Sequence, residues 1–156
     1  MAEAQFMQSE VEALSATAAF NAWAGFEVVH AADGHAELKL PWRSDLGQYA
    51  GFPHAAMIGG LIDTACGFAA FTLSGHVLAS HISVNCLAPA QGHSFVARAR
   101  VVKAGRRQVF ASAELFALRD GAEHLVATGD VILVPLASGV PANADRVRDR
   151  DDASAR

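Results

Sequence analysis

Residues 55–73 read AAMIGGLIDTACGFAAFTL, and this stretch decides the fold. Eighteen of its nineteen residues are apolar, glycine or threonine, and the remaining one is Asp63. No face of such a helix is polar, so we predict a helix from near His54 to about Leu73 that is covered on nearly all sides and ended by Gly75. An unpaired carboxylate in apolar surroundings is costly or takes up a proton, so Asp63 is either paired or used chemically.

The composition indicates one ordered domain. The chain has 156 residues, 52% of them hydrophobic and 18% charged, which is enough for a single core. A net charge of −4 argues against nucleic acid as a partner. Asp63 and three glycines argue against a membrane span at residues 55–73. The first ten residues carry acids where a signal peptide needs bases, so we expect a cytoplasmic protein.

The two cysteines, Cys66 and Cys86, lie in apolar segments. We expect both to be free, buried thiols, as in a reducing compartment. A disulfide between them is the alternative.

The residues before the central helix contain a helix signal and a long loop. Ser9 and Glu12 form a capping-box pattern, which predicts a helix from about Ser9 to Ala24 with Gly25 as its stop signal. Residues 41–53 (PWRSDLGQYAGFP) contain two prolines and two glycines, and we expect a loop there that forms part of a pocket wall.

Six strands are predicted from stretches whose side chains alternate between polar and apolar, or that lie next to turn residues. They are Phe26–His30, His35–Leu40, His81–Leu87, Ser94–Lys103, Gln108–Leu118 and Leu125–Val134. Turns are expected at Asp33-Gly34, at Gly105 and at Arg119-Asp120-Gly121. The last four strands would form an antiparallel meander, which gives an α+β domain whose sheet wraps one central helix. We divide the chain into an N-terminal helical segment (1–25), the domain (26–136) and a disordered tail (137–156).

The start of the central helix is the second candidate for chemistry. The first turn of a helix has unpaired N–H groups and partial positive charge, so the amides of Ala55 and Ala56 could hold an oxyanion. His54 and Asp63 lie nine residues apart, which is roughly 13–14 Å along a helix and on opposite faces. A two-fold dimer with antiparallel central helices would bring Asp63 of one protomer to the helix start of the other.

Structural explanations stand beside these interpretations. A lone buried aspartate can be a satisfied structural residue, and His54 can simply cap the helix. Five of the eight Lys and Arg residues before the tail lie close together, and they are either a solvated strand face or contacts for an anionic ligand: Arg98, Arg100, Lys103, Arg106 and Arg107. Ser83 and Asn85 share one strand face and can be polar residues that serve only the fold.

These motifs resemble the hotdog-fold acyl-CoA thioesterases of the phenylacetate-degradation and 4-hydroxybenzoyl-CoA type. That family has Gln or Asn, then His-Gly-Gly six residues later, then Asp or Glu nine residues further on. Here the series reads Gln48, His54-Ala55-Ala56 and Asp63. The stretches SVNCLAPAQGHSFVARARVVKAGRRQVFASAELF and RDGAEHLVATGDVILVP are similar to later strands of the family, so the resemblance covers about residues 26–135.

The resemblance implies hydrolysis of an aryl-, phenylacetyl- or medium-chain acyl-CoA. Asp63 would be the nucleophile or general base, the Ala55 amide the oxyanion donor, and Gln48 and His54 would hold the carbonyl from the other subunit. Coenzyme A would enter only as part of the substrate, without a metal or other cofactor. Residues implied in binding are Tyr49, Thr64, Ser83, Asn85, Gly105, Arg106 and Arg107. The family is typically a dimer of dimers, so a homotetramer is expected.

The sequence departs from the family at Ala88, where the family often has a basic residue before the proline of Leu-x-Pro, and at two places in and before the central helix. His-Ala-Ala replaces His-Gly-Gly, and Gly67 stands where some aryl-CoA members have a hydroxyl that holds the water. These departures favour the alternative, a non-catalytic acyl-CoA-binding protein of the same fold. The acyl group is expected to contact large apolar side chains: Trp42, Leu46, Tyr49, Phe52, Phe68 and Phe71.

Overall fold

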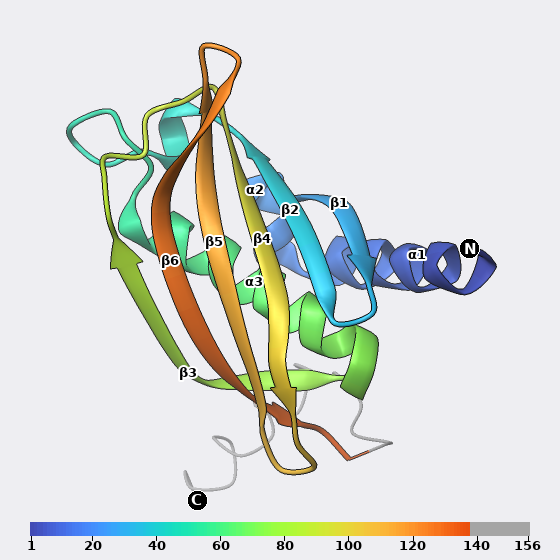
Figure 1. The fold of residues 1–156 in the computed structure, drawn as a ribbon. Coiled ribbons are helices and arrows are strands. Elements are labelled where there is room, and N and C mark those ends of the chain that lie inside the picture. The colour runs from blue at the N-terminus through green and yellow to red at the C-terminus, as the bar shows by residue number, and fades with distance from the viewer. Residues whose placement is uncertain (138–156) are drawn as a thin grey trace, which may run out of the picture.

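A computed structural model describes residues 1–137, so the expected disordered tail lies almost entirely outside the described residues. The α+β prediction is confirmed: a curved antiparallel sheet wraps around the long helix α3 (Figure 1). The helices are α1 (Ala2–Thr17), α2 (Ala19–Ala24) and α3 (Ala55–Ser74), with one 3₁₀ turn, Ser44–Leu46. The strands are β1 (Glu27–Ala32), β2 (His35–Pro41), β3 (Val77–Cys86), β4 (Ser94–Ala104), β5 (Val109–Arg119) and β6 (Ala122–Pro135).

The strand order corrects the predicted four-strand meander. The sheet runs β1-β2-β4-β5-β6-β3, so β4, β5 and β6 form a meander but β3 pairs with β6 at the far edge. The edge of β4 that β3 would need is taken by β2, whose residues 35–41 pair with residues 94–100. The connection from Leu87 to His93 therefore crosses the sheet instead of making a tight turn.

Two predicted hairpin turns are confirmed by their backbone angles. Asp33 and Gly34 have φ angles of 50° and 76°, and Asp120 and Gly121 have φ angles of 54° and 72°. Positive φ at both central residues is the type I′ pattern, which matches the right-handed twist of the flanking strands.

The predicted N-terminal helix was placed with the wrong first residue, and the segment forms two helices and not one. Helix α1 begins at Ala2, and Ser9 lies inside it, where its hydroxyl donates to the Gln5 carbonyl at 3.0 Å. The hydroxyl is thus used within the helix and not at a cap. At Ala18 the backbone is extended (φ −84°, ψ 110°), which separates α1 from α2. Gly25 ends α2 with φ 80°, as predicted.

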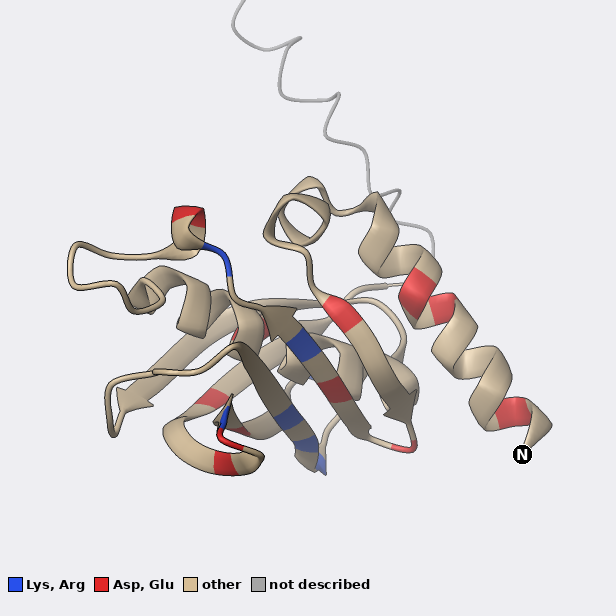
Figure 2. Ribbon diagram, turned by 90° about the horizontal axis from the view of Figure 1, so that it is seen from above, with Lys and Arg blue, Asp and Glu red and all other residues tan. Residues whose placement is uncertain are grey.

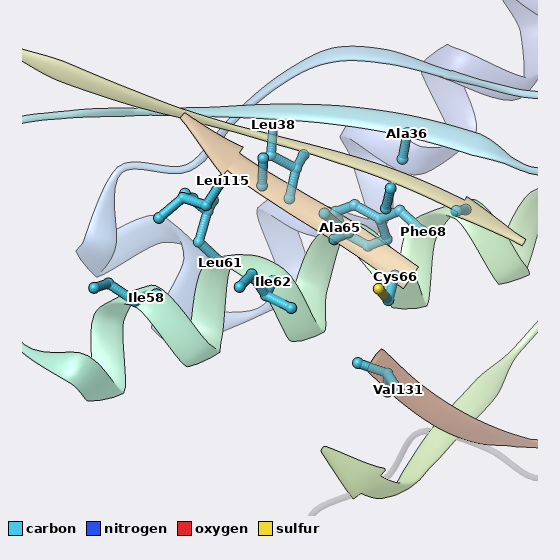
Figure 3. Close-up of a cluster of buried hydrophobic side chains, with 14 of the residues drawn as sticks. Ala36, Leu38, Ile58, Leu61, Ile62, Ala65, Cys66, Phe68, Leu115 and Val131 are labelled. Carbon is cyan, nitrogen blue, oxygen red and sulfur yellow. The ribbon is translucent and has the colours of Figure 1, made fainter. Parts of the chain in front are cut away.

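Helix α3 has the predicted ends, with His54 as N-cap and Gly75 after its last residue. One face packs into the sheet, where Ile58, Leu61 and Ile62 meet side chains of β2, β5 and β6 (Figure 3). The opposite face is only partly covered by the rest of the chain and carries mostly small residues: Ala56, Gly59, Gly60, Asp63, Thr64 and Gly67. The length and apolar composition of α3 would suit a membrane span, but half of its most apolar window is buried in the protein.

Gly129 on β6 sets how closely α3 approaches the sheet. A Cβ atom at Gly129 would lie 2.7 Å from Ile62 Cγ2 and 2.9 Å from the Ser83 carbonyl oxygen. Only a glycine allows this approach without displacement of helix or strand. The contact between Gly129 and Ile62 thus fixes the position of α3 on the sheet one residue before Asp63.

The cysteine prediction is half right. Cys66 and Cys86 are both free, and Cys66 is fully buried in α3. Cys86 is exposed at the end of β3, so the expectation that it is buried is wrong. Its strand lies at an edge of the sheet, where the apolar neighbours in sequence do not imply burial.

Candidate active site

The start of α3 has one backbone amide without a hydrogen-bond partner among the described residues. The His54 ring accepts from the Ala56 amide through Nδ1 at 3.0 Å, and the amides of Met57 and Ile58 donate to the His54 carbonyl. The Ala55 amide makes none of these bonds, and Ala55 is an exposed residue. Since Nδ1 accepts, the neutral ring carries its proton on Nε2, where it can donate to another group.

The loop before α3 holds Gln48 next to His54. The Gln48 amide donates to the Phe52 carbonyl at 2.8 Å, and the His54 amide donates to the Leu46 carbonyl at 2.9 Å. The Gln48 side chain accepts from the Ala50 amide through its carbonyl oxygen. Its NH₂ group remains available as a donor.

These residues line one cavity of about 580 Å³ at the start of α3. Four predicted site residues share it: Gln48, Tyr49, His54 and Ala55. The other walls are apolar and come from Phe52, Ile58 and the crossing loop Leu87–Ala90. The cavity therefore combines hydrogen-bond donors at one end with an apolar wall.

Asp63 lies in a second cavity, of about 260 Å³, together with the predicted Thr64. Burial raises the pKa of the Asp63 carboxyl, and burial is the one cause of the shift. Asp63 takes part in none of the four ion pairs among the described residues. A half-buried carboxylate without a cationic partner is suited to proton transfer or nucleophilic attack.

The two cavities divide the predicted acyl-contact residues. Phe68 and Phe71 lie in the Asp63 cavity, whereas Tyr49 and Phe52 lie in the cavity at the helix start. Trp42 and Leu46 line neither and belong to the core, where Trp42 packs edge-on against Phe95. The two cavities thus lie at different places along α3, as the nine-residue spacing of His54 and Asp63 indicates.

Comparisons with known proteins identify the family of the chain. The sequence profile of the Thioesterase superfamily matches residues 50–123. A thioesterase family protein from Silicibacter pomeroyi is 37% identical, with a TM-score of 0.79, and the match covers 82% of this chain and 96% of that one. The chain belongs to the thioesterase superfamily. The expected hotdog fold is thereby confirmed.

Two further structures extend the comparison. A mutant form of the phenylacetic acid degradation protein PaaI from Thermus thermophilus is 26% identical, with a TM-score of 0.67, over 75% of this chain and 98% of that one. The PaaI protein from the phenylacetic acid degradation operon of E. coli shares the fold, with a TM-score of 0.78 and 16% identity over 86% of this chain and 96% of that one. No curated protein matches the sequence significantly.

The remaining predicted residues of this superfamily member lie outside both cavities of the protomer. Ser83 and Asn85 pair with Asp130 and Thr128 of β6 and share their face of the sheet, the one turned away from α3. Gly105, Arg106 and Arg107 form the β4–β5 turn, at the opposite end of the sheet from the Gln48 loop (Figure 1). The β4–β5 turn is therefore far from the Ala55 amide within one chain.

The five clustered basic residues are spread along β4 and the turn that follows it, whereas Lys39, Arg43 and Arg119 lie in other segments (Figure 2). Arg98 is fully engaged: it binds Glu37 at 2.8 Å and Glu123 at 2.6 Å and lies over the Phe116 ring. The two glutamates raise the pKa of the Arg98 guanidinium. Arg106 and Arg107 are exposed at the turn and take part in none of the ion pairs of the described residues.

Several residues of the Asp63 cavity were not predicted from the sequence, among them Leu14, Asn21 and His76. Asn21 of α2 is 8% exposed, and its NH₂ group donates to the Ser15 hydroxyl at 3.2 Å. A signal was present, because Asn21 interrupts the apolar run AAFNAWAGF much as Asp63 interrupts the central helix. Its place beside Asp63 depends on how α2 packs, which sequence spacing does not give.

Proposed function

We propose that this protein hydrolyses an acyl-CoA thioester to the free acid and coenzyme A. The observation that carries the proposal is that α3 holds two groups suited to hydrolysis. The Ala55 amide at its start has no hydrogen-bond acceptor among the described residues, and the half-buried Asp63 in its middle has no ion-pair partner among them. Membership in the thioesterase superfamily supports thioester hydrolysis in general. The acyl-CoA substrate and the residue roles are our proposals.

In the proposed reaction, the Ala55 amide donates to the thioester oxygen as it becomes an oxyanion. Gln48 and the Nε2 hydrogen of His54 hold the same carbonyl. Asp63 takes a proton from a water molecule as that water attacks the carbonyl carbon. The tetrahedral intermediate then breaks its C–S bond, and the proton passes from Asp63 to the departing thiolate. In a second route the Asp63 carboxylate attacks the carbonyl carbon, the C–S bond breaks and coenzyme A leaves as its thiolate. Water then hydrolyses the mixed anhydride, which releases the acid, regenerates the Asp63 carboxylate and supplies the proton that the thiolate takes up.

The proposal needs two protomers in each site, with the Asp63 cavity of one facing the helix start of the other. Strand β3 lies at an edge of the sheet and exposes Leu78 and Ile82, which are 61% and 46% accessible. Exposed apolar residues on an edge strand support association of two copies. We propose a cytoplasmic homodimer that pairs into a tetramer, with neither nucleic acid nor membrane as partner.

The CoA portion would contact residues of both cavities and residues outside them, including the β4–β5 turn. Arg106 and Arg107 suit the phosphates of coenzyme A by charge. Tyr49 and Thr64 line the two cavities, and the other proposed contacts are Ser83, Asn85 and Gly105. The proposed reaction uses neither a metal ion nor a further cofactor.

A substitution at Ala55 tests the oxyanion donor without disturbing the helix. Proline is favoured at the first helical position, and the extended backbone of His54 (φ −61°, ψ 143°) suits a residue before proline. Ala55→Pro should therefore fold but lose the amide hydrogen, which lowers kcat about 10²–10³-fold. Asp63→Asn should abolish hydrolysis, while Asp33→Asn in the β1–β2 turn is the control. Normal turnover by Asp63→Asn would overturn the mechanism, and tight acyl-CoA binding without turnover by the wild type would support the non-catalytic alternative.

Mixing the two inactive variants tests the shared site. In a heterodimer of Ala55→Pro and Asp63→Asn, one composite site carries both changes and the other carries neither. Random exchange at equal amounts should restore about a quarter of the wild-type rate, because half of the dimers have one intact site of two. Sites built within single protomers would show no restoration.

A further inference from the structure

The Asp63 cavity continues along α3 beyond the carboxylate. Gly67, Phe68 and Phe71 follow Asp63 on the cavity side of the helix. The Phe71 ring meets the His76 ring edge-on, with centroids 5.3 Å apart, and His76 also lines the cavity. The facing walls are apolar and come from α1, β3 and β6: Leu14, Val77, Leu78, Ala79 and Leu133.

Gly67 is not explained by packing within the protomer. A Cβ atom at Gly67 would meet nothing within 4 Å. At Gly60, by contrast, a Cβ would lie 3.0 Å from the Phe20 ring, and at Gly129 it would strike Ile62. A glycine in a helix interior is less favourable than alanine, so its presence over an open cavity needs another reason.

The size of the cavity indicates what that space accommodates. A volume of about 260 Å³ corresponds to about nine water molecules at roughly 30 Å³ each. An acyl group with eight carbons and its carbonyl oxygen has the same number of heavy atoms. The lining is apolar except for Asp63, Thr64, Asn21 and His76, which suits an apolar acyl group whose carbonyl lies at Asp63.

We propose that Gly67 sets the size of the acyl group, which runs from Asp63 over Gly67 to the Phe71 and His76 rings. The class of substrate is an apolar acyl group of about eight carbons, linear or aromatic. This inference rests on the proposed function, since it places the thioester carbonyl at Asp63. Gly67 is then a specificity residue whose missing side chain leaves the path of the acyl group open.

Kinetics with Gly67→Ala and Gly67→Leu test the proposal. We expect kcat/KM for octanoyl-CoA to fall relative to butanoyl-CoA, by about 10-fold for each methylene group that no longer fits. The leucine variant should show the larger change, at least about 100-fold. Phenylacetyl-CoA is the further substrate to measure. Its acyl group has as many carbons as octanoyl, so the comparison shows whether the cavity prefers a linear chain or an aromatic ring.

Gly59→Ala is the matched control, the same change on the same helix. A Cβ at Gly59 would make only an ordinary contact, 3.9 Å from Val84, and Gly59 is not among the residues lining the Asp63 cavity. We expect the control to leave the ratio of octanoyl to butanoyl turnover unchanged. Equal losses for all acyl lengths in Gly67→Leu, or a loss of the oligomer measured by light scattering, would overturn the proposal.

Binding measurements separate this inference from the proposed function. In an Asp63→Asn background, calorimetry should show octanoyl-CoA binding more tightly than butanoyl-CoA, and adding Gly67→Leu should remove that difference. This result supports the acyl path even if the wild type hydrolyses no acyl-CoA, which would refute only the proposed function. Binding that does not depend on acyl length in the Asp63→Asn protein would refute the acyl path alone.

Discussion

The close approach of α3 to the sheet at Gly129 leads to a quantitative prediction for Gly129→Ala. The added methyl group would lie 2.7 Å from Ile62 Cγ2 and 2.9 Å from the Ser83 carbonyl oxygen. Ile62 is fully buried, and the carbonyl belongs to the backbone of β3, so neither atom moves easily. Overpacking typically costs about 1–3 kcal/mol, and two contacts put this substitution near the upper limit, at about 3 kcal/mol.

The measurement is thermal unfolding at one fixed protein concentration, because association would add to the stability. For a domain of this size, a loss of about 3 kcal/mol lowers Tm by about 6–12 °C. The double variant with Ile62→Ala removes one of the two contacts, so the added cost of Gly129→Ala should fall by about 1 kcal/mol in that background. A Tm for Gly129→Ala within about 2 °C of wild type would refute the reasoning.

Three further predictions follow from the site and its surroundings. Burial raises the pKa of Asp63 in the folded protein, so ionisation of its carboxyl lowers the stability of the fold as pH rises through that pKa. Asp63→Asn should therefore raise Tm at about pH 7 but not at about pH 3. The hydrolysis rate of the wild type should fall as pH drops through the raised pKa. Arg43 donates to the Trp23 and Ala24 carbonyls at the end of α2 at 2.9 and 3.3 Å, so Arg43→Ala should speed hydrogen exchange in α2 and leave α3 unchanged. Burial, with nearby carboxylates, raises the pKa of the Cys66 thiol to about 12, so a thiol reagent at about pH 8 should label only Cys86 until the protein unfolds.

The elements that the sequence predicts well are those with local causes. His54 caps α3 through its own ring, and Gly75 ends the helix, so both ends are encoded within a few residues. The two hairpin turns likewise depend on residues that tolerate positive φ. The place of β3 could not be predicted in the same way, because its partner on β6 lies far along the chain. The role of Ser9 could not be predicted, because a serine that caps a helix and one that bonds back inside it look alike in sequence.

In the candidate site, too, features with local causes could be predicted and features that depend on tertiary contacts could not. Asp63 was found because a single charge in an apolar run is conspicuous, and the Ala55 amide because every helix start has unpaired donors. That the His54 ring occupies the Ala56 amide, and so singles out Ala55, required the structure. Asn21 and Leu14 reach the Asp63 cavity from helices packed beside α3, a tertiary contact that no spacing in the chain indicates.

The position of β3 also has a consequence for how the chain folds. Strands β5 and β6 close through a two-residue turn, whereas β3 pairs with β6 through residues as distant in sequence as Ser83 and Asp130. Bringing residues together that are distant in sequence costs conformational entropy, and this cost slows folding. We therefore expect the β4–β5–β6 hairpins to form early and β3 to join late. The strand proposed to meet a second copy would then be the last part of the sheet to order, so the concentration of the chain would affect the final step of its folding.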